Sequence, residues 1–375
     1  MIYLDSAATT LQKPPAVAAA VCSAMARAAS PGRGGHLWGM EAAKIAFRCR
    51  ETAAKLFCLS DPERVVFTFN ATHGLNIAIR SVVRPGSTVL ISGYEHNAVS
   101  RALYSIPDVR LRVALSAPFD QKGMLCSFRD ELARGVDAVV CTHVSNVFGF
   151  ILPVEEIGKL CRKYDVPLII DASQSAGCLA VDFAALGAQY IAMPGHKGLY
   201  GPQGTGILLC DKEGEPILFG GTGSISSSQE MPDFLPDRLE AGTPNIPGIA
   251  GLYEGMRFVS RHGVQRLGER ESGLIRLLGN RLRTIPGVYV WMAEDPRTQS
   301  AVLSFSVRDS DCEQVGEWLG QHHVAVRAGL HCAPIAHQSA GTLEQGTVRA
   351  SASAFTNRQE IERAACLIAQ FCARR

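Results

Sequence analysis

The chain of 375 residues has no apolar run near the roughly 20 residues that a membrane-spanning helix needs. Its formal net charge is only +2, and charges of both signs are mixed along the chain, so no basic surface for nucleic acid is expected. Residues 1–5 show no basic segment leading into an apolar core, and no export signal is predicted. These absences predict a cytoplasmic protein with no membrane and no nucleic-acid partner.

Closely paired cysteines are also lacking. The twelve cysteines are scattered, and no Cys-x-x-Cys occurs. In a long chain without an export signal we expect free thiols in a reducing compartment, and we predict no metal site. Cys141, Cys178 and Cys210 lie in or beside apolar runs and are expected to pack as small core residues. Cys332 differs, because its surroundings are polar and contain glycine.

The sequence is rich, by contrast, in short apolar runs that alternate with helical segments. The runs expected to form strands include residues 65–69, 89–91, 138–142, 168–170 and 190–193. Continuous apolar strands alternating with helices indicate an α/β fold with a mostly parallel sheet covered by helices on both faces. A polar cluster follows each of these strands, at the edge where such sheets bind their ligands.

Length and composition fit one large domain and a smaller one. The 47% content of hydrophobic residues is enough for a sizeable core. We expect an N-terminal arm at 1–14, a large domain at 15–247, a connecting helix at 248–264 and a small C-terminal α/β domain at 265–375. Residues 219–247, rich in glycine, serine and proline, are expected to form a long ordered loop.

Lys197 lies among glycines between two apolar runs, 190–193 and 205–210. A lysine between buried strands is costly, and a primary amine there suggests a Schiff-base lysine. On this stretch alone, a solvated lysine in a surface turn is the alternative. A Schiff-base lysine implies a carbonyl cofactor, of which pyridoxal 5'-phosphate (PLP) is the commonest. PLP also needs a carboxylate for its pyridinium nitrogen, an anion site for its phosphate and a surface to stack on.

Candidates for these supports lie at the same predicted sheet edge. Asp171, at the end of an apolar strand, would keep the pyridine nitrogen protonated, and Gln174 could hydrogen-bond the ring hydroxyl. Thr72 and His73 stand at a helix N-terminus, which favours a phosphate, and His96 could lie flat on the ring. The alternatives are helix caps for Asp171 and Thr72 and a core histidine for His96. Their joint occurrence at one edge favours PLP.

Motifs along nearly the whole chain resemble those of a known family. They are Leu-Asp-Ser-Ala-Ala-Thr-Thr at 4–10, Glu-His-Asn at 95–97, Ser-Asn-Val-Phe-Gly at 145–149, Asp-Ala-Ser-Gln-Ser at 171–175, Gly-His-Lys-Gly at 195–198, Arg-Leu-Glu-Ala-Gly-Thr-Pro-Asn at 238–245, Arg-Ala-Gly-Leu-His-Cys-Ala at 327–333 and Val-Arg-Ala-Ser at 348–351. The chain resembles class V aminotransferase-fold enzymes (PLP-dependent transferase fold type I), and within them cysteine desulfurases and selenocysteine lyases. The motif at 327–333 is the part specific to desulfurases, and its short form is similar to the SufS-like, group II branch.

The resemblance implies a role for each cofactor residue. Lys197 would form the Schiff base and later move protons, Asp171 would pair with the pyridinium, and Gln174 with the ring oxygen. His96 would stack on the ring as a candidate acid or base. The remaining cofactor-binding candidates are Thr72, His73 and His196 at the phosphate, Asn146 near the ring hydroxyl, and Thr243, which would reach the phosphate of the neighbouring subunit of a homodimer.

The resemblance also implies a substrate site for L-cysteine. Arg349 would clamp the substrate carboxylate bidentately, with Asn146 and Ala8 beside it. PLP weakens the Cβ–S bond, and a Cys332 thiolate would take the sulfur as a persulfide and leave L-alanine. A thiolate needs a lowered pKa or an adjacent base, and His331 and Arg327 are near in sequence. A buried structural thiol is the alternative for Cys332.

Several functions remain open beside a desulfurase. The same residues would serve a selenocysteine lyase acting on L-selenocysteine, and another class V reaction, transamination or β-elimination, would leave Cys332 incidental. A non-catalytic sulfur carrier or scaffold on this fold is the alternative from a different class. A sulfur-acceptor protein is expected as a partner, without a sequence feature that identifies it.

Two departures from the family pattern concern the phosphate site. Pro194 stands two residues before His196, where many relatives have a serine that binds the phosphate. Residues 70–73, Asn-Ala-Thr-His, replace the doubled threonine and glutamate of relatives. Part of the anion site is therefore expected to come from Thr72, His73 or Thr243.

Overall fold

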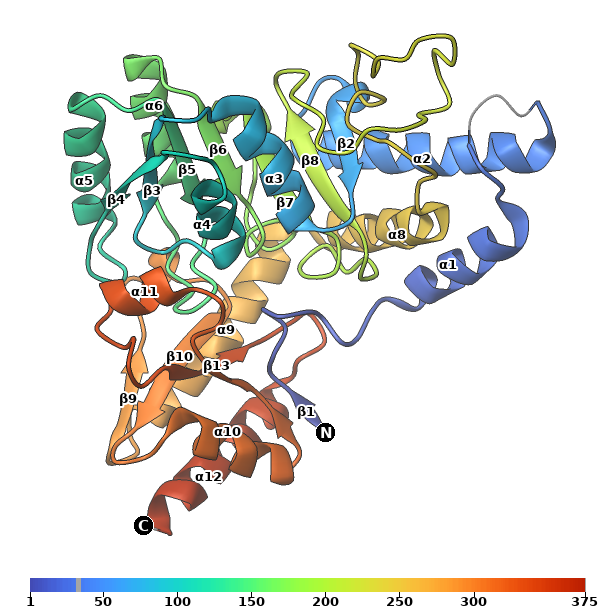
Figure 1. The fold of residues 1–375 in the computed structure, drawn as a ribbon. Helices are drawn as coiled ribbons and strands as arrows, with labels where there is room; N and C mark the ends of the chain where they lie inside the picture. Colours follow the sequence, from blue (N-terminus) through green and yellow to red (C-terminus); the bar gives the residue numbers. More distant parts are fainter. Residues whose placement is uncertain (32–34, 375) are drawn as a thin grey trace.

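The structure, a computed structural model, describes residues 1–31 and 35–374. A large α/β region occupies the upper part of Figure 1, and a smaller region below it holds both chain termini. Among the described residues, the larger region is built on a seven-stranded sheet and the smaller on a four-stranded one.

The strands of the large sheet follow the order β2-β8-β7-β6-β5-β3-β4. Their bounds are β2 (Val65–Thr68), β3 (Thr88–Ser92), β4 (Arg110–Ala114), β5 (Ala138–Thr142), β6 (Leu168–Asp171), β7 (Tyr190–Pro194) and β8 (Gly206–Cys210). β8 is antiparallel to both of its neighbours, and the other pairs are parallel. The predicted α/β fold with a mostly parallel sheet is therefore confirmed.

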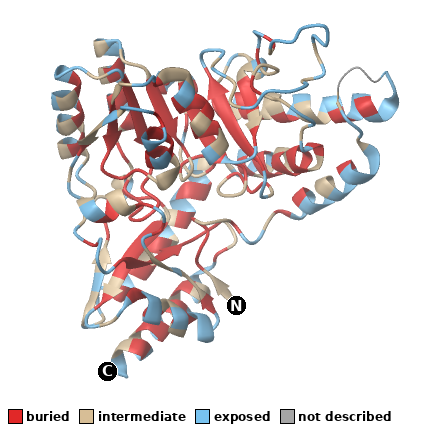
Figure 2. Ribbon diagram, in the orientation of Figure 1, coloured by how far each residue is buried: buried red, intermediate tan, exposed pale blue. Residues whose placement is uncertain are grey.

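Helices cover both faces of this sheet, because successive residues of each buried strand point to opposite sides. Along β5, Val139 and Cys141 face one core, while Ala138 and Val140 face the other. The first core is closed by α2 (Leu37–Leu56), α5 (Gln121–Ala133), α6 (Val154–Tyr164), α7 (Phe183–Leu186) and α8 (Ile246–His262). The second is closed by α3 (Ala71–Val82) and α4 (Asn97–Tyr104). Helix α1 (Pro15–Arg27) packs on α8, and Figure 2 shows the buried strands between partly exposed helices.

The smaller region is an antiparallel sheet with helices on it. Its strand order is β12-β13-β10-β9, with bounds β9 (Val288–Trp291), β10 (Val302–Val307), β12 (Arg327–Gly329) and β13 (Thr347–Ser351). The helices packed on it are α9 (Val264–Leu282), α10 (Cys312–Gln321) and α12 (Arg358–Ala373), whereas α11 (Pro334–Ser339) contributes Ala336 to the core of the large sheet. The 3₁₀ turns η1 (Pro62–Arg64) and η2 (Pro296–Thr298) complete the chain.

The N-terminal arm is attached to this smaller region. Strand β1 (Ile2–Tyr3) pairs in parallel with β11 (Val324–Ala325), and Leu4 lies in the hydrophobic core of the C-terminal sheet. Asp5 forms an isolated bridge with Ser351 at the end of β13. The arm therefore brings its next residues, 5–10, to the junction between the two sheets.

Several element boundaries differ from the sequence-based expectation. Helix α3 begins at Ala71, which places Thr72 and His73 in its first turn, and Asn70 caps it by accepting from the backbone N–H of His73. Strand β4 and helix α5 were not predicted, since charged residues interrupt the apolar residues of both segments. The segment that carries Cys332, between β12 and β13, also contains helix α11. Residues 219–245 contain no helix or strand, as expected for the long loop.

Candidate active site

The carboxyl edge of the large sheet carries Asp171. It ends β6, and its backbone pairs with Thr142 of β5 on one side and Ala192 of β7 on the other. Its side chain is buried, with 3% of the residue exposed, and one carboxylate oxygen accepts from the backbone N–H of Ser173 at 2.9 Å. Backbone pairing on both sides fixes this carboxylate at the sheet edge.

Lys197 follows β7 and is partly buried. Burial lowers the pKa of its ammonium group to about 8, while the Asp171 carboxylate opposes that shift. The loop is tied to the N-terminal arm, because the backbone N–H and the hydroxyl of Thr10 both donate to the carbonyl oxygen of His196. A lysine with a lowered pKa carries a larger fraction of neutral, nucleophilic amine at neutral pH.

His96 caps helix α4, with its Nδ1 accepting from the backbone N–H of Ala98 at 3.0 Å. Burial lowers the pKa of this imidazole; the charge of Asp171 raises it, and those of Lys197 and Arg349 lower it further. Interactions of this kind require proximity. The charges of Asp171, Lys197 and Arg349 therefore all act on the His96 imidazole.

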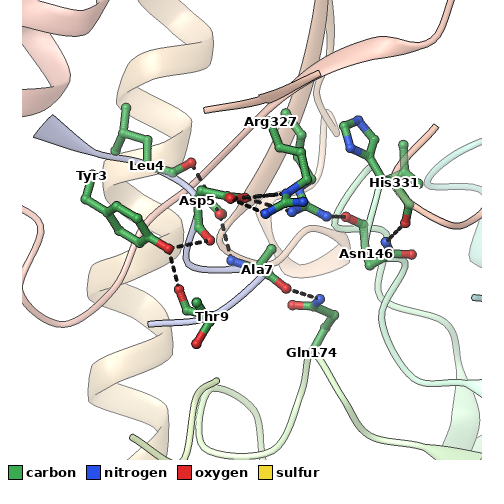
Figure 3. A network of polar contacts seen from close by, with 12 residues as sticks. Tyr3, Leu4, Asp5, Ala7, Thr9, Asn146, Gln174, Arg327 and His331 are labelled. Carbon is green, nitrogen blue, oxygen red and sulfur yellow. Dashed lines mark hydrogen bonds and ion pairs between the residues drawn. The ribbon is translucent and has the colours of Figure 1, made fainter. Parts of the chain in front are cut away.

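Gln174 and Ala8 meet at the arm. Gln174 donates from Nε2 to the carbonyl oxygen of Ala7 at 2.9 Å (Figure 3), and Ala8 donates its backbone N–H to Asp5. Ala7, Gln174 and Lys197 line one small cavity together with Ser6, whose buried hydroxyl has no hydrogen-bond partner among the described residues. Lys197 is thus part of the lining of this cavity, which combines polar and apolar residues.

Arg349 lies in β13 and is 2% exposed. Its Nη1 donates to the backbone oxygen of Asn146 at 3.0 Å, and its Nη2 to Asp5 at 2.9 Å. Its Nε–H and the side-chain Oδ1 of Asn146 are both buried without a partner among the described residues. An unpaired guanidinium N–H beside an unpaired amide oxygen is costly unless a ligand binds there, so these two atoms mark a site for a polar group.

Asp5 is shared between two arginines. Arg327 and Arg349 are register partners on β12 and β13, and Arg327 binds the Asp5 carboxylate through Nε and Nη2, as Figure 3 shows. Like charges placed directly opposite on neighbouring strands repel each other. The Asp5 carboxylate therefore offsets that repulsion and orients Arg349.

Cys332 is exposed and lies on a short segment between β12 and α11. Its carbonyl oxygen accepts from the backbone N–H of Asn97 at 2.8 Å, so the cysteine stands directly beside the His96 cap. The expectation that His331 would help to ionise this thiol is wrong. Burial and nearby positive charge lower the pKa of His331 to about 2, so this imidazole is uncharged at neutral pH.

The predicted phosphate residues are more dispersed. Thr72 and Thr243 are exposed, and His73 and Thr243 line a cavity whose lining residues do not include Lys197. His73 stacks on Phe69 and accepts its backbone N–H at Nδ1. His196 lies with Nδ1 3.1 Å from the Thr9 hydroxyl, and burial lowers its pKa to about 4.

Three residues near the site were missed by sequence reasoning: Asp5, Lys13 and Glu95. Lys13 donates from Nζ to the carbonyl oxygen of His196 at 2.9 Å, and burial lowers its pKa to about 8. Glu95 is fully buried, accepts from Ser92 and from the backbone N–H of Thr142, and has a pKa raised by burial to about 8. The available signal was a charged residue inside a segment of small or apolar residues.

Comparison with known proteins gives the class to which this site belongs. The model of the class-V aminotransferase family matches residues 2–364, so the chain belongs to that family. A probable cysteine desulfurase of Methanothermobacter thermautotrophicus is 32% identical, with 96% of this chain and 92% of the relative covered. A cysteine desulfurase of Salmonella agona is 30% identical, with 97% and 91% covered.

A solved structure agrees with these relatives. The apo cysteine desulfurase of Thermococcus onnurineus superimposes with a TM-score of 0.91 at 28% identity, covering all of this chain and 95% of that one. Membership in this family confirms the fold class and the predicted cofactor, PLP. The unpaired buried atoms of Arg349 and Asn146, together with Lys197 and Asp171, fit a PLP-bound substrate chemically. No helix among residues 1–31 and 35–374 combines the length and the apolar character that a membrane span needs.

Proposed function

We propose that this enzyme is a cysteine desulfurase, which converts L-cysteine to L-alanine and transfers the sulfur to Cys332. The observation that carries the proposal is the position of Cys332, exposed and hydrogen-bonded to Asn97 beside the predicted ring-stacking histidine. A thiol beside that histidine, in a chain that also carries the lysine and the carboxylate that PLP requires, is the arrangement a sulfur-transfer enzyme needs. The names of the relatives support the same activity.

The cofactor would be held by residues of the sheet edge. Lys197 binds its aldehyde, Asp171 its pyridinium, Gln174 its ring oxygen and His96 its face. The other proposed cofactor contacts are Asn146, Thr72, His73, His196 and Thr243. When bound, PLP supplies an electron sink for bonds at the substrate α-carbon.

The substrate carboxylate would bind Arg349. Its free Nε–H is buried, so an incoming carboxylate finds a donor that has already lost its water. The unpaired Oδ1 of Asn146 can accept from the substrate amine, and Ala8 adds a small side chain that leaves room for the ligand. Because Asp5 fixes Arg349 in advance, binding costs little reorganisation.

Lys197 and Cys332 would carry out the proton and sulfur steps. Lys197, with its lowered pKa, removes the proton from the α-carbon and later returns protons to the product. The Cys332 thiolate attacks the substrate sulfur, so the new S–S bond forms as the Cβ–S bond breaks. The electron pair of the broken bond stays on the carbon, which is then protonated to give the methyl group of alanine.

The test is to incubate the pure PLP-loaded protein with L-cysteine and measure alanine and sulfide. Wild type should form alanine, Cys332→Ala should not, and Cys126→Ala, which removes another exposed cysteine, should behave as wild type. Full alanine formation by Cys332→Ala would favour another class V reaction. L-selenocysteine is the discriminating second substrate: turnover retained only for selenium would identify a lyase function that does not need the thiol. Absence of alanine from wild type would overturn the proposal.

We further propose a cytoplasmic homodimer that passes sulfur to an acceptor protein. Large apolar side chains are exposed on α2, including Leu37, Trp38 and Phe47 at 81%, 61% and 55%. Several exposed large apolar side chains on one helix are usually covered in part by a partner, and exposed Thr243 would then reach the neighbouring cofactor. Light scattering should give the mass of two chains, and Trp38→Glu should shift it toward one. A monomeric wild type would contradict the dimer.

A further inference from the structure

The segment that carries the proposed nucleophile has an unusual backbone. His331 and Cys332 are adjacent non-glycine residues with φ angles of 51° and 55°. This left-handed region is unfavourable for L-residues with a Cβ, and it persists only where the surroundings impose it. The structure must therefore contain contacts that hold the two residues in this conformation.

Contacts from three different elements hold the segment. Asn97, at the start of α4, donates its backbone N–H to the carbonyl oxygen of Cys332 at 2.8 Å. Asn146 donates from Nδ2 to the carbonyl oxygen of His331, also at 2.8 Å (Figure 3). The His331 imidazole in turn lies with Nε2 3.2 Å from both the carbonyl oxygen and the hydroxyl of Thr347 in β13.

The His331 side chain contributes geometry and not charge. The Thr347 hydroxyl donates to Ser304 and its carbonyl oxygen only accepts, so we assign the proton of this contact to Nε2. The residue is 8% exposed, and burial lowers the pKa of the ring to about 2, so the ring is uncharged at neutral pH. An uncharged imidazole does not stabilise a thiolate by charge, and its low pKa disfavours uptake of a proton at the unpaired Nδ1.

The second anchor links this segment to the proposed substrate site. Asn146 uses its side-chain amide for His331 and its backbone oxygen for Arg349 Nη1. One residue thus fixes the distance between the group that would bind the substrate carboxylate and the loop that carries the thiol. For a substrate as small as cysteine, the carboxylate and sulfur lie only a few bonds apart, so this distance decides whether the thiol meets the sulfur.

We infer that His331 is a positioning residue that, with Asn97 and Asn146, sets where the Cys332 thiol meets the substrate sulfur. The inference rests on the proposed desulfurase function for its catalytic consequence. It extends that function by assigning separate roles within the motif 327–333: Cys332 is the nucleophile, and the buried His331 beside it holds its backbone in place. Its physical content, the rigidity of the Cys332 backbone, can be measured without any turnover.

The first measurement follows the backbone directly. The Asn97 amide is the first helical residue of α4, and its recorded acceptor is Cys332. In His331→Leu we expect hydrogen exchange of this amide to accelerate about tenfold or more, because the anchor to Thr347 is lost. His331→Gln, whose Nε2 can still donate to the Thr347 oxygen, should restore much of the protection. Unchanged exchange in His331→Leu would overturn the inference.

The second measurement follows the chemistry. We expect His331→Leu to lower kcat for L-cysteine by about 10–100-fold with KM within about threefold, since a misplacement near 1 Å costs this much. Cofactor absorption and L-selenocysteine turnover should stay near wild type, because selenium leaves more easily than sulfur. If His331→Leu lost turnover of both substrates together with its cofactor absorption, the role of His331 would be purely structural, and the inference would be overturned.

Controls separate these outcomes from general damage and from failure of the function itself. His337→Leu removes the buried histidine whose ring packs 5.6 Å from that of His331, but which bonds Thr342 and no backbone atom of residues 331–332, so it tests loss of ring packing without loss of the anchor. It should lower stability without changing the ratio of cysteine to selenocysteine turnover. If wild type makes no alanine, the proposed function fails, while the Asn97 exchange result still decides whether His331 anchors Cys332.

Discussion

The two sides of the candidate site are built in different ways. Asp171 and Lys197 lie at or after strand ends of the large sheet, and the backbone pairing of β5, β6 and β7 fixes their positions. Cys332 lies on a short segment held by single hydrogen bonds from distant residues, Asn97 and Asn146 among them. The cofactor side is therefore part of the core, whereas the sulfur side depends on a few polar contacts.

This difference predicts different responses to substitution. On the cofactor side, changing a side chain removes its chemistry and leaves the neighbouring positions intact, because the sheet does not depend on that side chain. On the sulfur side, changing one polar contact displaces other groups, because those contacts define the geometry. Substitutions on the two sides should therefore differ in whether binding, catalysis or only stability is lost.

Lys197→Ala should produce the largest loss. Without the amine, neither covalent attachment of PLP nor proton transfer at the substrate is possible, and we expect alanine formation to fall by about 10³-fold or more. The thermal midpoint of the unloaded protein should change little, since removing a buried lysine removes a desolvation cost. Alanine assay and cofactor absorption measure the effect, with exposed Lys212→Ala as control. Substantial activity in Lys197→Ala would remove the basis for the proposed chemistry.

The same contrast explains what the sequence could predict. Asp171 and Lys197 follow apolar runs, so alternation of strands and helices was enough to collect them at one edge. The arrangement at Asp5 was beyond such reasoning, because its partners are 322 and 344 residues away and periodicity carries no information on pairings of that range. Strand β4 was missed for a related reason, since an edge strand with three partly exposed residues lacks the apolar run of its neighbours.

His331 shows a further limit of sequence proximity. A histidine next to a cysteine suggested help in forming the thiolate. In the fold its ring turns to Thr347 and is buried and uncharged, so adjacency in the chain did not mean adjacency of function. The exposure of Thr72 and Thr243 is likewise a property of the folded surface, and their proposed phosphate roles stay predictions.

Asp5→Asn tests the sulfur side at the arginine pair. The change keeps the shape and removes the charge between Arg327 and Arg349, so the two guanidinium groups repel and Arg349 loses its orientation. We expect KM for L-cysteine to rise by about tenfold with kcat nearly unchanged, as uniform binding is lost. Steady-state kinetics measure this split. Asp295→Asn, which removes an exposed arginine partner elsewhere, should have no effect.

A second substitution sharpens that test. Adding Arg327→Gln to Asp5→Asn removes one of the two repelling charges, and the double variant should recover part of the lost affinity. If the double variant binds L-cysteine no better than Asp5→Asn alone, repulsion between the arginines is not the cause. If Asp5→Asn lowers kcat and cofactor content together, the arm has a structural role only.

The pH dependence of PLP uptake tests the lowered pKa of Lys197 without any substitution. With a pKa of about 8, roughly a tenth of Lys197 is neutral at pH 7 and about half at pH 8. The rate at which the unloaded protein takes up PLP should therefore rise about fivefold between pH 7 and pH 8 and level off above pH 9. Stopped-flow absorbance measures this rate. A rate that kept increasing tenfold per unit to pH 10 would show an unperturbed lysine.

Glu95→Gln should have the smallest effect on activity and a distinct effect on stability. Glutamine keeps the oxygen that accepts from Thr142, so alanine formation at pH 7 should stay within about threefold. Burial raises the Glu95 pKa from 4.5 to about 8, so between these values the folded protein holds a proton that the unfolded chain has released. Stability from this group is fully present below pH 4.5 and is lost as pH rises through 8, by up to about 1.4 kcal/mol per pH unit.

Urea unfolding of both proteins at several pH values isolates this contribution, because all other titrating groups are shared. The wild type should lose stability relative to Glu95→Gln as pH rises from about 5 to 8, and the difference should flatten above that range. Parallel curves would mean that Glu95 is ionised in the folded protein. A second negative charge would then lie near Asp171. The backbone pairing of β6 would have to hold the Asp171 carboxylate in place against repulsion from ionised Glu95.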